Sequence, residues 1–161
     1  MKDRRVVSLE RVLSRRKTLE RKLNDALLVL RGEQQALEGA LAQCRQAVDQ
    51  QTLVLREQNR KLDEMMGQTF QPDAYLRLRE HQIATAQRHS LLENQANEAA
   101  HQVAGKQQQV AQGRAQIVQN RARIDIYAKR RDKLCREIET AVEDAQDEEA
   151  SESRRPGPRP F

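Results

Sequence analysis

Three histidines and two cysteines are the residues of this chain best suited to metal or nucleophilic chemistry. His81 and His89 lie eight residues apart, which could place both on one helix face, and His101 follows twelve residues later. Zinc needs further ligands at matching spacing, and the sequence has neither these nor a His-Glu-x-x-His pattern. No His or Lys beside Cys44 or Cys135 is arranged to activate a nucleophile. We therefore expect no metal site, no cofactor and no catalytic residue, and the chain is predicted not to be an enzyme.

The composition is typical of long helices and not of an ordinary globule. Of the 161 residues, 33% are charged and 2% are aromatic, with no Trp, four Pro and six Gly. No apolar run is long enough to span a bilayer, and the start of the chain lacks a secretory apolar segment. We expect a cytoplasmic protein with two free thiols and no direct membrane insertion, at most peripheral at the inner membrane through partners.

Charge is concentrated in three segments. Residues 1–31 hold ten basic and four acidic residues, and residues 121–136 hold seven basic and two acidic residues. Residues 137–152 hold eight acidic and no basic residues. The two basic clusters admit three interpretations: solvated helix faces, contact with an acidic or polar protein surface, or contact with nucleic acid. Nucleic acid is the least favoured, because the chain offers no aromatic platform for bases and the acidic segment would repel phosphate.

A seven-residue apolar repeat runs through the first 65 residues and predicts a helix whose narrow apolar stripe needs a facing helix. Two columns carry the repeat. One column is Val6, Leu13, Glu20, Leu27, Gln34, Leu41, Val48, Leu55, Leu62, and the other is Leu9, Arg16, Leu23, Leu30, Leu37, Cys44, Gln51, Gln58, Met65.

A break at residues 67–71 separates this helix from a second one. Gly67 can end a helix in the left-handed conformation, and Pro72 fits the first turn of the next. In the second helix the clearest column begins Val103, Val110, Ile117, Ile124. We expect its companion column to be weaker, formed by Gln107, Arg114, Arg121, Ala128, Cys135, Val142.

These patterns predict an all-α fold, a long antiparallel two-helix coiled-coil hairpin over residues 1–150. Its helices are expected at about 3–66 and 72–148, with a disordered Pro/Arg tail at 151–161. Residue i should lie opposite roughly residue 139 minus i, so the two basic clusters meet at the open end. The closed end carries Met65, Met66, Phe70 and Tyr75.

The seam over 6–65, the break at 67–72, the column from Val103 to Ile138 and the two basic clusters together resemble the FliJ/YscO family. These are central-stalk proteins of bacterial flagellar and virulence type III secretion ATPases. The resemblance implies a non-enzymatic hairpin that inserts its open end into a hexameric secretion ATPase and reaches an export-gate membrane protein. Some family members also bind secretion chaperones.

On this resemblance we expect two contact regions. The ATPase ring would contact Arg4, Arg5, Arg11, Arg15, Arg16, Lys129, Arg130, Arg131 and Lys133, and the export gate or a chaperone would contact Met65, Met66, Phe70 and Tyr75. Two other functions stay open, a structural coiled-coil adaptor for secretion chaperones and, less favoured, a basic hairpin that binds nucleic acid.

Overall fold

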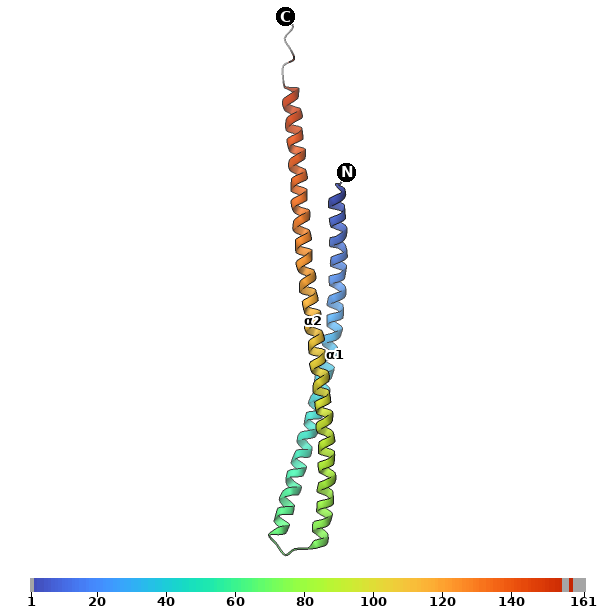
Figure 1. The fold of residues 1–161 in the computed structure, drawn as a ribbon, viewed down its shortest axis with the longest axis vertical. Coiled ribbons are helices and arrows are strands. Elements are labelled where there is room, and N and C mark those ends of the chain that lie inside the picture. Colours follow the sequence, from blue (N-terminus) through green and yellow to red (C-terminus); the bar gives the residue numbers. More distant parts are fainter. Residues whose placement is uncertain (1, 155–156, 158–161) are drawn as a thin grey trace. The chain divides into compact units, whose positions relative to one another are not determined.

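The computed structural model describes residues 2–154 and 157, and within them it consists of two helices (Figure 1). Helix α1 spans Arg4–Met66, with 63 residues, and α2 spans Pro72–Ser153, with 82 residues. No strand occurs among the described residues, which confirms the all-α helical hairpin. None of the described helices is long and apolar enough to cross a membrane.

The chain divides into two compact units. The terminal unit joins Met1–Asp25 to Gly113–Phe161, and the turn unit is Ala26–Gln112. In each unit a stretch of α1 packs against a stretch of α2.

Asp3 begins α1 as its N-cap. Its carboxylate accepts a hydrogen bond from the Arg5 main-chain N–H at 2.7 Å, and the Val7 N–H donates to the Asp3 carbonyl at 3.1 Å. The hydrogen bond from the Arg5 side chain lowers the pKa of the Asp3 carboxyl most, and the hydrogen bond from the Arg5 main-chain N–H lowers it further. The carboxylate form therefore stabilises the beginning of the helix.

The connection between the helices differs in one detail from the expected geometry. Gly67 does not take the left-handed conformation, since the described glycines all have negative φ. Instead the Gly67 N–H donates to the Glu64 carbonyl at 3.1 Å, a tightened last turn of 3₁₀ type that ends α1 without a left-handed residue. Helix α2 begins at Pro72, and Asp73 places negative charge in its first turn.

Both apolar columns of α1 face α2. Five members of the first column are buried, namely Val6, Leu13, Leu27, Leu41 and Leu62. Every member of the second column, from Leu9 to Met65, is half-buried. The seven-residue spacing therefore places the stripe of α1 on the seam as expected.

The companion column expected in α2 is wrong at four of its six positions. Gln107, Arg114, Arg121 and Val142 are exposed, whereas Ala128 and Cys135 are half-buried. The residues that accompany the buried Val103, Val110 and Ile117 stand three positions after them instead, and they are Lys106, Gly113 and Asn120. Lys106 and Asn120 are polar and Gly113 has no side chain, so a search for apolar residues at heptad spacing does not identify them.

With that shift the α2 seam alternates steps of three and four residues without interruption from Tyr75 to Ile138. Near the beginning of α2 it also runs through polar residues, since Gln82 and His89 are half-buried while Ile83 is 48% exposed. These polar residues are tolerated in the seam because they form hydrogen bonds with residues of α1.

Four contacts across the seam of the turn unit set its antiparallel register. Thr52 Oγ1 lies 2.9 Å from His89 Nε2, and Gln58 donates to Thr85 at 3.1 Å. Lys106 pairs with Glu33 at 2.7 Å, and Gln82 donates to Asn59. The numbers of these paired residues add to between 139 and 143, close to the 139 expected from the position of the break.

The end of α2 continues past the beginning of α1 in the terminal unit (Figure 1). Ile138 is still half-buried, and residues 139–154 are all exposed. We call residues 139–153 the acidic overhang. The helix ends at Ser153 and not near Glu148, so residues 151–153 of the expected tail are helical. Most of the remaining tail, residues 155–156 and 158–161, lies outside the described residues.

Candidate protein-interaction surfaces

The nine basic residues expected to contact a partner all lie in the terminal unit. Arg16 and Arg131 are half-buried, and the other seven are exposed. Antiparallel packing brings the two clusters onto one helix pair: Asn120 Nδ2, on α2, donates to the main-chain carbonyl of Arg16, on α1, at 3.0 Å. The described side chains thus form one cationic surface from segments more than a hundred residues apart.

Some of these charges are already paired within the chain. Arg5 pairs with Asp3 at 3.1 Å, Arg131 with Asp132 at 2.9 Å, and Lys133 with Glu137 at 3.9 Å. Among the described residues no ion pair forms at Arg4, Arg11, Arg15, Arg16, Lys129 and Arg130. These six cations are therefore available to a partner.

Shallow grooves lie on the cationic surface, and two of them combine basic residues with apolar side chains. One groove, of about 300 Å³, is lined by Glu10, Leu13, Ser14, Lys17, Thr18, Arg21 and Arg131. A second, of about 530 Å³, is lined by Arg16, Arg123, Ile126, Tyr127 and Arg130. Lys17, Arg21 and Arg123 were not among the expected contact residues, although all three belong to the basic clusters in the sequence. Each groove combines apolar and cationic side chains, which suits an acidic protein surface.

Two polar features of the terminal unit lie outside the expected contact residues. Arg121 pairs with Glu20 at 2.6 Å across the seam. Asn120 is 3% exposed, and its Oδ1 atom is buried without a hydrogen-bond partner. Asn120 occupies a heptad position of α2, one residue before the Arg121 of the expected column.

The four residues expected at the closed end lie in the turn unit. Met66 and Phe70 are 67% and 52% exposed, whereas Met65 and Tyr75 are half-buried. The Phe70 and Tyr75 rings pack with their centroids 5.5 Å apart and their planes inclined by 55°. The end of α1 and the connection therefore expose most of Met66 and about half of Phe70 to solvent.

Among residues 2–154 and 157, no three His, Cys, Asp and Glu side chains gather closely enough to hold a metal ion. Cys44 and Cys135 are free and half-buried. The surfaces described above are suited to binding.

Comparison with protein-family models finds a match to the family described as bacterial type III secretion protein (HrpB7), over residues 4–154. No curated protein and no solved structure matches the chain. The match covers both helices completely, and it supports the expected link to type III secretion, while membership of the FliJ/YscO family stays a prediction. On this evidence the chain belongs to the HrpB7 family of bacterial type III secretion proteins.

Proposed function

We propose that this protein is the non-enzymatic central-stalk subunit of a type III secretion ATPase complex. In this proposal the terminal unit enters the hexameric ATPase ring, and the connection between the helices contacts the export-gate membrane protein. The protein acts in the cytoplasm and reaches the inner membrane through these partners. Family membership supports the secretion system, and the helical hairpin supports the stalk.

One observation carries the proposal, the convergence of two distant basic clusters on one helix pair. A stalk inside a ring must contact several subunits with one elongated surface. Exposed ion pairs contribute about 0–1 kcal/mol each, so six unpaired cations provide many weak contacts and no single deep one. Contacts of this kind can be exchanged between neighbouring subunits with small barriers.

The test uses the purified chain and the ATPase encoded with it in the same secretion system. Reversing Arg11, Arg15, Arg130 and Arg131 to Glu should abolish co-purification with the ATPase and the stimulation of phosphate release. A matched control reverses four exposed arginines of the turn unit, Arg56, Arg77, Arg79 and Arg88. The proposal is wrong if both quadruple variants behave alike, or if the wild-type chain leaves phosphate release unchanged.

An adaptor that binds secretion chaperones is the second candidate, and the exposure of Met66 and Phe70 favours it. Such an adaptor would bind a chaperone through the turn unit without changing ATP turnover. Substituting Met66→Ser with Phe70→Ser would then abolish chaperone binding. Under the stalk proposal the same double variant keeps full ATPase stimulation and loses export-gate binding.

A further inference from the structure

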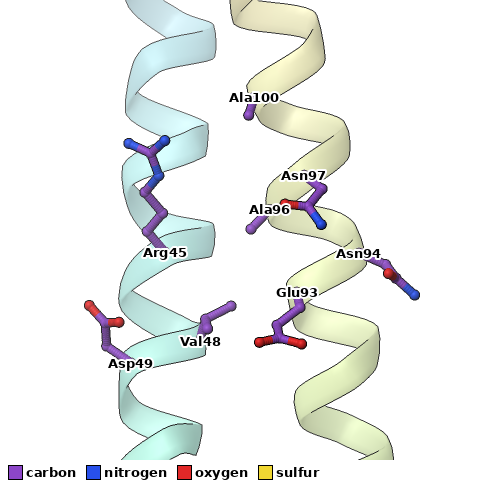
Figure 2. A pocket seen from close by; sticks show the side chains of 8 residues that line it. All are labelled: Arg45, Val48, Asp49, Glu93, Asn94, Ala96, Asn97 and Ala100. Carbon is purple, nitrogen blue, oxygen red and sulfur yellow. The ribbon is translucent and has the colours of Figure 1, made fainter.

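A groove runs along the packed helices of the turn unit. Its first part, of about 490 Å³, is lined by Arg45, Val48, Asp49, Glu93, Asn94, Ala96, Asn97 and Ala100 (Figure 2). Its second part, of about 410 Å³, is lined by Glu38, Leu41, Ala42, Arg45, Ala100, Val103, Ala104 and Gln107. Arg45 and Ala100 belong to both parts, so the two form one surface.

Seven of the fourteen residues that line the groove are apolar, and four of these seven are alanines. Ala96, Ala100 and Ala104 follow one another at four-residue steps along α2, and Ala42 stands on α1. The buried seam residues Leu41 and Val103 also line the groove. Rows at four-residue steps are the ridges by which helices pack, and small side chains allow the axes to approach to about 8 Å. In Figure 2 Ala96 and Ala100 project from α2 toward the side of α1.

The two helices that wall the groove favour a helix over an extended peptide as the bound partner. Both walls are helices, whose main-chain N–H and C=O groups bond to one another. An extended peptide would find no main-chain partner there and would leave its own polar groups unpaired, whereas a helix satisfies them internally. The α1 wall runs from Glu38 to Asp49 and the α2 wall from Glu93 to Gln107, so an occupant of about 14 residues would span roughly 20 Å.

The rim of the groove favours cationic flanks on that helix. Three carboxylates, Glu38, Asp49 and Glu93, stand around one guanidinium, Arg45. Among the described residues neither Glu38 nor Asp49 forms an ion pair, and Glu93 approaches only the His89 ring, at 3.7 Å. Glu38 accepts a hydrogen bond from the neutral Gln34 amide at 2.9 Å, so the negative charges of Glu38 and Asp49 both stay unpaired for an outside partner.

We propose that this groove binds one amphipathic helix of a partner protein, with a narrow Ala/Leu stripe flanked by Lys and Arg, to form a local three-helix bundle. The site does not depend on what the cationic terminal unit contacts, because its residues all lie between Ala26 and Gln112. Gain or loss of binding here therefore leaves the stalk proposal standing.

The experiment measures binding of two designed helical peptides to the full-length chain by fluorescence anisotropy. Both peptides have about 14 residues and the same Ala/Leu stripe, and their flanks are Lys in one and Glu in the other. We expect the Lys-flanked peptide to bind, and the Glu-flanked peptide to bind at least tenfold more weakly. Absence of binding by the Lys-flanked peptide, or equal binding of both, would overturn the proposal.

Variants of matched chemistry locate the site. Ala100→Arg fills the groove and should weaken the Lys-flanked peptide at least tenfold, whereas Ala40→Arg, an exposed alanine of α1 outside the groove lining, should change binding less than twofold. Asp49→Lys should shift the preference toward the Glu-flanked peptide. Equal effects of the two Arg variants would refute the site. So would a wild-type dimer in sedimentation that Ala100→Arg dissolves, because the occupant would then be a second copy.

Discussion

Replacing the buried Asn120 by Leu should stabilise the terminal unit. Asn120 makes one hydrogen bond, to the Arg16 carbonyl at 3.0 Å, and buries a second polar atom without a partner. Losing a neutral hydrogen bond costs about 1 kcal/mol, and relieving an unpaired buried acceptor returns about 1–3 kcal/mol. Burying a Leu side chain adds about 1.5–3 kcal/mol, part of which is lost to imperfect packing. A net gain of about 2 kcal/mol follows, or roughly 4–8 °C in Tm for a chain of this size.

The assay is urea unfolding of wild type and Asn120→Leu, followed by circular dichroism at 222 nm. Gln119→Leu is the control, because Gln119 is the exposed neighbour and should change the free energy of unfolding by less than about 0.5 kcal/mol. We also expect Asn120→Leu to associate more in sedimentation, since a polar heptad residue restricts pairing at the expense of stability. Destabilisation by Asn120→Leu would show that the amide is fully satisfied and that the seam is packed differently.

Four further outcomes follow. Gly32→Ala and Gly39→Ala should each stabilise α1 by about 0.5–1 kcal/mol in urea unfolding, because both glycines have open space where a Cβ would stand; a loss of stability would mean a hidden contact. A double-mutant cycle on Glu20 and Arg121 should give a coupling free energy of about 0–1 kcal/mol that becomes smaller in 1 M salt, since the Arg121 side chain is 61% exposed. A coupling free energy that does not change with salt would show that the pair is buried from solvent. Asp3→Asn should be less stable than wild type above pH 3.8, because it lacks the ion pair with Arg5. The difference in stability should vanish as the pH falls through the lowered pKa of Asp3, since protonation removes that ion pair from wild type as well. A difference that persists in acid would exclude the carboxylate as its source. Gln58→Leu should raise the stability of the turn unit in thermal unfolding, because Gln58 Oε1 is buried without a partner, and a lower Tm would indicate a bound water there.

Helix α1 could be predicted from the sequence because most of its heptad positions, from Val6 to Met65, hold apolar residues. The beginning of α2 could be predicted from Pro72, whose ring fits the first turn of a helix. The second seam could not be identified by apolar residues alone, because Lys106, Asn120 and Gln82 occupy heptad positions. Spacing was the more reliable signal there: steps of three and four from Val103 lead to each of them.

The cationic surface could be predicted once antiparallel pairing was assumed, since the two basic clusters stand at nearly equal distances from the break. Which cations are free could not be predicted, because ion pairs such as Arg131–Asp132 depend on side-chain conformation. The groove of the turn unit gave no sequence signal either. Ala96, Ala100 and Ala104 are ordinary helix-forming residues in the sequence, and only the structure shows that they line a groove.

The claim that both basic clusters share one antiparallel helix pair is tested most directly by a distance between spin labels at Ser8 and Lys129, two exposed positions of the terminal unit. Neighbouring helix axes lie about 8–10 Å apart, so we expect a narrow distribution on the order of 20–30 Å once the label arms are included. The distance should persist when labelled protein is diluted with unlabelled protein. A distribution beyond roughly 60 Å, or a short distance that dilution removes, would contradict the pairing and the function built on it.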